Sequence, residues 1–434
     1  MRPIRRRDII KGLGVGGLGV GLGTGALGST GWAATTGAST GAASAARAVD
    51  PLPVSDPTNA GGWTLNPAFS DEFDGDELDL RKWYNFHTHW EGRSPSYFEP
   101  TNVTVGDGHA VIPFRNVNEV LNPSFEEGLT SSWDISASGA RSVADGNFSP
   151  RVLRLDAGAW ARQTIGTLRP GTRYRLTAYA RVANGGTGVL RLADYGGRAR
   201  DVALRGQNFG VVELTFLTGP DATSATVSVE NTASTGSLDV TMVAIVEVRR
   251  EDPPVGSYFS TGVIQSRSEA HYGYYEVRVR VADSSSTSSF WFQGSESEID
   301  VVEAIGASTL DPSMGTKMPM NLHYFPGGWQ NDQAFPVTYD TGVRLADGFH
   351  VFGLDWQADA IRFYFDGRLV RTQENLHWHE PEYLFLDSEA FLWCLAQPAA
   401  EPVPDRLCAG VAEVVVSPAL ERGPGDPRGP VVTS

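Results

Sequence analysis

Cysteine is almost absent from this chain, whose 434 residues include only Cys394 and Cys408. Two cysteines can form at most one bridge, which excludes a small fold built on a framework of disulfides. Long segments with helical periodicity are scarce as well. Segments rich in glycine, aromatic residues, threonine and valine take their place, and they favour an all-β protein with room for two or three domains.

Positive charge is also in short supply, since the formal net charge is −16 at pH 7. Residues 1–48 hold six basic residues and one acidic residue, so their removal would lower the net charge to −21. Such an acidic protein is not expected to bind nucleic acid, which requires a basic surface against its phosphates. It also suits a heavily sulfated polysaccharide poorly unless the binding site is locally basic. The charge therefore favours a neutral or sparsely charged glycan.

The N-terminal segment has the pattern of an export signal. Arg5, Arg6 and Arg7 precede a weakly apolar stretch, as in a twin-arginine signal, and cleavage after Ala48 would fit the small-residue rule. Residues 12–31 contain too many glycines for a persuasive membrane-spanning helix. We expect a signal peptide at 1–48 and a secreted monomer, extracellular or at the cell surface, with no membrane attachment after processing.

The segment SEIDVVEA (297–304) carries the strongest chemical signal. Side chains alternate between the faces of a regular strand, so Glu303 would point away from Glu298 and Asp300. A β-bulge between Asp300 and Glu303 would bring all three carboxylates to one face, and bulges often re-aim side chains beside active sites. The alternative is a strand edge with solubilising acids, but the flanking aliphatic residues indicate a buried strand.

Three neighbouring carboxylates suit the hydrolysis of a glycosidic bond. Their repulsion raises the pKa of at least one, so one group can be an ionised nucleophile while another is a protonated acid. A separation of roughly 5–5.5 Å between Glu298 and Glu303 would correspond to the retaining mechanism. Asp300, between them, can share a proton with the nucleophile.

The motif resembles the signature of glycoside hydrolase family 16, E-[ILV]-D-x-x-E. Further resemblance lies in SDEFDG (70–75), HYGYYEVR (271–278) and DGRLVR (366–371), and it covers most of 62–117 and 257–393. The resemblance implies a β-jelly-roll sandwich with Glu298 as nucleophile, Asp300 as its assisting acid and Glu303 as acid/base. The catalytic domain would then be discontinuous, formed by 49–117 and 251–434.

Residues 118–250 are not required by that fold and are expected to form a second β-sandwich inserted in a loop. Alternating runs separated by Gly/Pro turns predict its strands. Its opening segment LNPSFEEG (121–128) resembles carbohydrate-binding modules of families 4 and 9. Trp133, Trp160 and Tyr195 are candidate platforms for sugar rings, although each could equally belong to the core.

The segment WEGRSPSYF (90–98) resembles the agarase and porphyranase branch of the family. The resemblance implies Trp90 and Trp291 as stacking residues, Arg93 as a donor to hydroxyl or sulfate groups, and Glu389 as a substrate-facing acid. His323 is predicted to bind a substrate hydroxyl near the nucleophile. The alternatives are a core role for Trp291, a loop-stabilising role for Arg93 and a purely structural one for His323.

The resemblance implies no cofactor for catalysis, but the family often holds a structural calcium ion. It would lie near Glu72 and Glu413, although VAEVVV (411–416) matches the family's last strand poorly.

The sequence thus predicts a secreted, endo-acting, retaining glycosidase whose partner is a polysaccharide, with β-linked galactan of the agar or porphyran type favoured. Carrageenan or β-1,3-glucan is the alternative substrate. A polysaccharide-binding protein without catalysis is the alternative from another class, but binding alone has no use for mutually repelling carboxylates.

Overall fold

The structure is a computed structural model that describes residues 52–129, 132–145, 148–248, 253–308 and 311–391, together with the backbone of a strand at 408–422. The predicted signal peptide and Cys394 lie outside the described residues. Within them, no helix is both long and apolar enough to cross a membrane.

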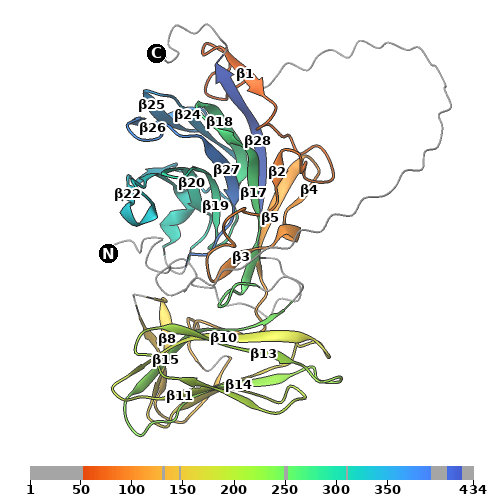
Figure 1. Cartoon of the computed structure of the whole chain (residues 1–434), viewed down its shortest axis with the longest axis vertical. Coiled ribbons are helices and arrows are strands. Elements are labelled where there is room, and N and C mark those ends of the chain that lie inside the picture. The colour runs from red at the N-terminus through yellow and green to blue at the C-terminus, as the bar shows by residue number, and fades with distance from the viewer. Residues whose placement is uncertain are drawn as a thin grey trace, which may run out of the picture. The chain divides into compact units, whose positions relative to one another are not determined.

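Two large sheets form the first sandwich (Figure 1). Within the described residues, the ten-stranded sheet consists of β1 (Trp63–Asn66), β3 (Ser96–Phe98), β4 (Thr104–Gly106), β5 (His109–Asn116), β16 (Phe259–Thr261), β18 (Gly273–Arg280), β24 (His350–Trp356), β25 (Ala360–Phe365), β26 (Arg368–Glu374) and β28 (Cys408–Arg422). Its order is β26-β25-β24-β18-β28-β5-β16-β3, with β1 paired to β28 and β4 to β5. The last strand, which matches the family poorly in sequence, is therefore present in this sheet.

The second sheet of this sandwich carries the acidic motif. Within the described residues it consists of β2 (Trp83–Tyr84), β17 (Val263–Ala270), β19 (Thr287–Gln293), β20 (Ser297–Ile305), β21 (Lys317–Tyr324), β22 (Gln333–Ala334), β23 (Val337–Asp340) and β27 (Glu382–Asp387). Its order is β2-β17-β27-β19-β20-β21-β22, with β23 paired to β21. Where the structure describes the loops, they hold three short 3-10 helices: η2 (Pro100–Asn102), η3 (Pro312–Thr316) and η4 (Trp329–Asn331).

A hydrophobic core fills the space between these two sheets. Alternate residues along each strand point inward, as the period of two in a strand requires. The buried residues include Tyr275, Val277, Phe352, Leu354 and Phe363 from the first sheet and Ile264, Phe290, Phe292, Leu384 and Leu386 from the second. The opposite face of the second sheet carries the candidate site.

In the described part of the chain, a second sandwich lies between β5 and β16. Its strands are β6 (Asp134–Ile135), β7 (Ala140–Ala144), β8 (Arg151–Asp156), β9 (Trp160–Ile165), β10 (Arg173–Ala183), β11 (Gly188–Ala193), β12 (Arg200–Leu204), β13 (Gly210–Leu217), β14 (Ala225–Asn231) and β15 (Ser237–Glu247). They form two five-stranded sheets, β13-β10-β15-β8-β7 and β12-β11-β14-β9-β6.

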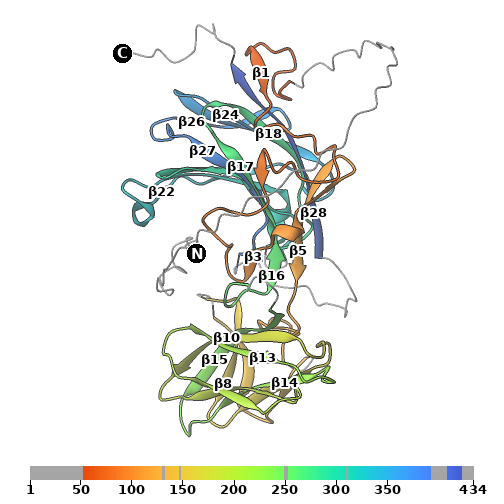
Figure 2. The same cartoon turned by 45° about the vertical axis from the view of Figure 1, so that its right-hand side comes forward.

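The chain leaves and re-enters the first sandwich at neighbouring positions. Asn116 at the end of β5 is paired with Phe259 at the start of β16, and Arg115 is paired with Ser260. Figure 2 shows β5 and β16 side by side. Because the two ends meet, the parent sheet remains continuous whatever lies between them, which explains why an insertion is tolerated here.

The core of the inserted sandwich contains two of the three predicted sugar platforms. Trp133 is 3% exposed and Tyr195 is 6% exposed, and both pack in the core cluster. The alternative interpretation, that these residues belong to the core, is therefore correct for both. Trp160 is half-buried, with the Arg162 guanidinium 5.0 Å from its ring centroid, so this residue alone keeps the predicted role.

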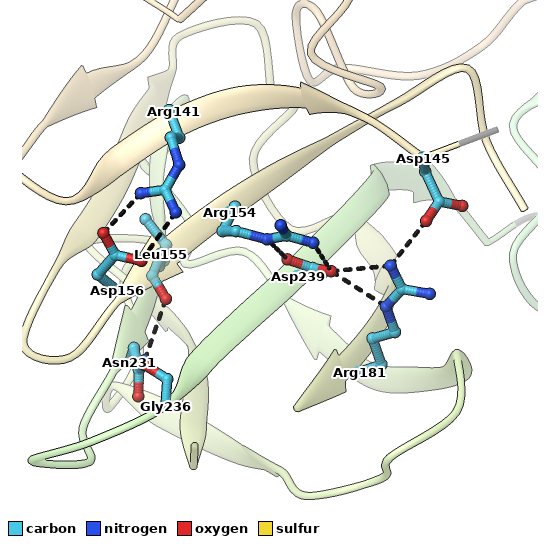
Figure 3. Close-up of polar contacts among 9 residues, drawn as sticks. All are labelled: Arg141, Asp145, Arg154, Leu155, Asp156, Arg181, Asn231, Gly236 and Asp239. Atoms are coloured by element: carbon cyan, nitrogen blue, oxygen red, sulfur yellow. Dashed lines mark hydrogen bonds and ion pairs between the residues drawn. The ribbon is translucent and has the colours of Figure 1, made fainter. Parts of the chain in front are cut away.

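Polar side chains cross one sheet of the insert in a single row (Figure 3). Asp239 on β15 stands opposite Arg181 on β10 and Arg154 on β8. Its carboxylate accepts hydrogen bonds from Arg154 Nε at 2.7 Å and from Arg181 Nε at 3.0 Å, and Arg181 also donates to Asp145 at 2.7 Å. Such charge-assisted bonds between strands distant in sequence fix the register of this sheet.

Candidate active site

A β-bulge interrupts the strand that carries the acidic motif. On the neighbouring strand β19, Phe290 pairs with Val302 whereas Trp291 pairs with Asp300, so Val301 has no separate partner position in this ladder. Two residues of β20 thus oppose one step of β19, which is the definition of a bulge. The bulge predicted between Asp300 and Glu303 is confirmed.

The bulge places the three carboxylates on the same face of the sheet. Glu298, Asp300 and Glu303 stand opposite Gln293, Trp291 and Ser289, which are alternate residues of β19 and therefore share a face. The intervening residues Ile299, Val301 and Val302 belong to the hydrophobic core on the other side. We call the side with the carboxylates the active-site face.

Two of the carboxylates are deeply buried. Glu298 and Asp300 are both 0% exposed, while Glu303 is half-buried. The side-chain amide of Gln293 donates a hydrogen bond of 2.8 Å to Oε2 of Glu298. This donor holds the carboxylate in one orientation, as a nucleophile requires.

His323 on β21 supplies positive charge to these carboxylates. It stands opposite Glu298, and its Nε2 lies 3.4 Å from Oδ2 of Asp300 and 3.9 Å from Oε1 of Glu298. Its Nδ1 lies 2.8 Å from Oδ1 of Asp332. Burial lowers the pKa of His323, but hydrogen bonds to Asp300 and Asp332 and the charge of Glu298 outweigh burial and raise it to about 10.

A pKa raised to about 10 favours the charged form of the imidazole at neutral pH. Asn321 also contacts the ring: its amide nitrogen lies 2.7 Å from Nε2, and its amide oxygen accepts a hydrogen bond from the Leu322 backbone amide. The sequence located His323 beside the nucleophile but missed its role as a counter-ion.

The predicted substrate contacts Trp90, Arg93 and Glu389 come together at another part of the site. Arg93 Nη2 lies 3.5 Å from Oε2 of Glu389, and the two side chains are 11% and 2% exposed. The guanidinium also lies 4.6 Å from the ring centroid of Phe391 and 5.7 Å from that of Trp90. In this arrangement the Arg93–Glu389 ion pair anchors the loop that carries Trp90.

Trp291 lies on the active-site face but offers little surface. It is 2% exposed, its ring stacks on Phe385 at 4.4 Å, and its Nε1 donates to Asp387 at 3.1 Å. One ring face is thus covered by protein. The arrangement favours the alternative interpretation of Trp291 as a packed residue, and a stacking role would require its ring to be uncovered.

His87 is a site residue that the sequence interpretation missed. Its ring stacks on Phe385 at 4.7 Å and on Trp291 at 6.2 Å, and burial, followed by the charge of His89, lowers its pKa to about 4. Nδ1 accepts a hydrogen bond from the His89 amide, so the neutral ring carries its proton on Nε2, which has no partner among the described residues. The available signal was its position three residues before Trp90.

A buried carboxyl group lies near the start of the catalytic strand. The Ser297 hydroxyl is 2.6 Å from Oε1 of Glu382 and 2.8 Å from Oε1 of Glu380. One hydroxyl can donate only one hydrogen, so one of these contacts needs a proton from a carboxyl group. Burial raises the pKa of Glu382, which is 0% exposed, well above its usual value. The protonated Glu382 therefore donates to Ser297, which donates to Glu380.

The predicted calcium site near Glu72 and Glu413 lies partly outside the described residues. Glu72 is exposed, and the side chain of Glu413 lies outside the described residues. Asp71, beside Glu72, already accepts hydrogen bonds from Trp83 Nε1 and the Phe73 amide. In the described part of the chain, three side-chain ligand atoms of His, Cys, Asp or Glu converge only at Glu298, Asp300 and His323. The calcium site stays a prediction.

Comparisons with known proteins identify the family of this chain. The chain matches the sequence model described as the GH16 domain of β-porphyranases A–D over residues 63–149 and 221–407, more than half of its length. It is 30% identical to κ-carrageenase of Pseudoalteromonas carrageenovora over 147 residues, which cover 30% of this chain and only 37% of that enzyme. It is 21% identical to β-porphyranase B of Phocaeicola plebeius over 386 residues, which cover 79% and 80% of the two chains.

Among solved structures, porphyranase B of Zobellia galactanivorans gives a TM-score of 0.45 at 14% identity, with 83% of this chain and 92% of that chain covered. The family match, which includes both segments of the first sandwich, decides the assignment. The chain therefore belongs to the β-porphyranase group of glycoside hydrolase family 16, whose members are retaining endo-glycosidases.

Proposed function

We propose that this protein is an exported endo-hydrolase of β-linked galactan of the agar or porphyran type. The observation that supports it most is the bulge at Val301, which puts Glu298, Asp300 and Glu303 on one face beside a charged histidine. The galactan substrate is inferred from the relative named β-porphyranase B, which is similar over most of both chains.

In the proposed reaction Glu298 attacks the anomeric carbon while Glu303 gives its proton to the glycosidic oxygen. The carbon–oxygen bond breaks and a covalent glycosyl-enzyme forms. Glu303 then takes a proton from water, the water oxygen attacks the anomeric carbon, and Glu298 is released. Two inversions at the same carbon keep the β configuration.

Asp300 and His323 keep Glu298 ready for attack. The charged imidazole stabilises negative charge on both neighbouring carboxylates, so Glu298 can be ionised despite its burial. The imidazole stabilises the Asp300 carboxylate more than that of Glu298, because Asp300 lies closer to Nε2. Asp300 can also share a proton with Glu298 as the covalent bond forms and breaks.

Carrageenan is the second candidate substrate. The specific observation in its favour is the 30% identity to κ-carrageenase, although this likeness is confined to 147 residues. A β-1,3-glucan remains the further alternative from the sequence.

The inserted sandwich is proposed to bind the polysaccharide rather than to cleave it. Trp160 supports this role because its ring is half-buried and lies beside Arg162, so aromatic and charged groups meet at one partly exposed position. We further propose a monomer exported through its twin-arginine segment, with catalysis independent of any cofactor.

The test is reducing-sugar release from agarose, porphyran, carrageenans and laminarin, followed by proton NMR of the first products. Galactan cleavage with an initial β-anomer is the expected result. Exclusive activity on laminarin would overturn the proposed substrate, and an initial α-anomer would overturn the retaining reaction. Binding to these polymers without cleavage would instead favour the non-catalytic alternative.

A further inference from the structure

One tryptophan near the active-site face has no place in the reaction proposed above. Trp329 is 47% exposed, and it is the only tryptophan among the described residues with so large an exposed surface. It begins the short helix η4 in the loop between β21 and β22. Tryptophan offers a large apolar surface with one polar group and is enriched at binding interfaces, so its contacts decide whether this exposed ring can meet a ligand.

Ring contacts place Trp329 on the active-site face. Its ring centroid lies 4.1 Å from that of Phe325, and the Phe325 ring stacks on the imidazole of His323 at 5.8 Å. This stacking puts the Phe325 ring on the same side of the sheet as His323. Asp332, from the same loop, reaches back to Nδ1 of His323. The loop therefore lies on the face that holds the carboxylates, and the Phe325 ring separates Trp329 from His323.

Hydrogen bonds hold this loop in one conformation. The side chain of Asn331 donates to the Pro326 carbonyl at 2.7 Å, and that of Gln330 donates to the Gly327 carbonyl at 2.8 Å. The Phe325 amide donates to the Glu296 carbonyl at 2.6 Å, which ties the loop to the start of the catalytic strand. A rigid loop presents the ring without an entropic cost of ordering it at each binding event.

The strand order puts Trp329 and Trp90 on opposite sides of the carboxylates. The catalytic strand β20 has β19, β27 and β17 on one side and β21 and β22 on the other. The Trp90 ring contacts His87, which stacks on Phe385 of β27, whereas Trp329 belongs to the β21–β22 loop. A sugar chain that contacts both aromatic residues must cross the strands and pass over Glu298.

We propose that Trp329 forms a sugar-binding subsite on the β21–β22 side of the active-site face. Its exposed ring face would stack on the C–H face of a neutral pyranose unit of the polysaccharide substrate. This inference rests on the proposed function. It assigns to Trp329 the binding of the sugar units that lie on the β21–β22 side of the scissile bond. Since the ring does not touch the reacting atoms, its contribution is to substrate binding.

The test compares Trp329→Ala and Trp329→Phe in the full-length enzyme, with the polysaccharide that the wild type cleaves fastest and with its shortest cleavable oligosaccharide. Loss of one stacking contact predicts a KM for the polymer that rises about three- to tenfold in Trp329→Ala, with little change in kcat. Trp329→Phe keeps an aromatic face and should retain most of the affinity. Leu369→Ala, which removes an equally exposed apolar side chain from strand β26 of the other sheet, is the control.

An unchanged polymer KM in Trp329→Ala would overturn this inference and leave the proposed function intact. Equal loss in Trp329→Ala and Leu369→Ala would overturn it too, because it would reflect a general effect of the exposed surface. A fall in kcat with KM unchanged would contradict a binding role. If the wild type cleaves none of the polysaccharides, the proposed function and this inference fail together.

Discussion

Nε2 of His323 lies 3.4 Å from Oδ2 of Asp300, across the paired strands β21 and β20. Both side chains are nearly excluded from solvent, at 12% and 1% exposure, so their attraction is weakly screened. Asp332 adds a second carboxylate at 2.8 Å from the same ring. The buried imidazole thus compensates part of the negative charge of the acidic motif. Removal of either His323 or a carboxylate would leave the other group buried with less charge compensation.

The first prediction concerns His323→Gln. The pKa of His323 is raised to about 10 from an ordinary 6.5, so the stabilisation from its charged form is fully present below pH 6.5 and is lost as the pH rises through 10. His323→Gln should lower the free energy of unfolding by about 2–5 kcal/mol at pH 6 and by much less at pH 10.5. Urea unfolding of the wild type and His323→Gln at both pH values measures this loss of stability. An equal loss at pH 6 and pH 10.5 would contradict the assignment of a charged imidazole.

The second prediction concerns the catalytic carboxylates. Glu298→Gln and Glu303→Gln should each reduce kcat by about a thousandfold or more, because neither an attacking carboxylate nor a proton donor can be replaced by an amide. Circular dichroism should show that both variants are folded. Glu269→Gln, at an exposed position of β17 in the same sheet, is the matched control and should keep wild-type activity. Near-normal turnover by either catalytic variant would reject the proposed roles.

The third prediction concerns the protonated Glu382. A carboxyl group with a raised pKa in the folded state lowers stability as the pH rises above its ordinary value of 4.5, because only the unfolded chain then releases the proton. Glu382→Gln lacks this proton and its amide can still donate to Ser297. The free energy of unfolding of Glu382→Gln should therefore rise relative to that of the wild type, by up to about 1.4 kcal/mol for each pH unit above 4.5.

Thermal unfolding of the wild type, Glu382→Gln and Glu269→Gln at pH 5, 6 and 7 provides the measurement. Glu269→Gln, which replaces an exposed side chain, should show the same change of stability with pH as the wild type. Parallel curves for Glu382→Gln and wild type would show that Glu382 is ionised in the folded protein.

The fourth prediction concerns the inserted sandwich. Deletion of 118–250 with a short linker should preserve cleavage of soluble substrate but weaken action on gels or solid polymer. The linker need only be short because Asn116 and Phe259, which flank the insert, are paired neighbours. Trp160→Ala tests the same role with the fold intact, through sedimentation with insoluble polymer. An equal loss of activity on soluble and solid substrates after deletion would make the insert part of the catalytic unit.

The sequence alone was sufficient for the features that depend on local spacing. The order of acids in 297–304 predicted a bulge, and the bulge is present at Val301, because alternation along a strand and the position of an extra residue are properties of one short segment. A second sandwich between the two parts of the catalytic domain was expected from the sequence, because family-like strand motifs lie on both sides of a stretch that the family fold does not require. Fold class and reaction class follow from these motifs, and the family match confirms both.

Only the tertiary structure decided which distant residues meet. The pairing of Arg93 with Glu389 and the contact of His323 with Asp300 depend on strand order and register across the sheet, which no local pattern specifies. Exposure likewise depends on what packs against a side chain. Trp291 and Trp133 are covered by neighbours from other strands, whereas Trp329 is left in solvent by a tight loop. An aromatic residue has the same chemistry in all three places, and only its packing determines whether it stabilises the fold or can bind a sugar.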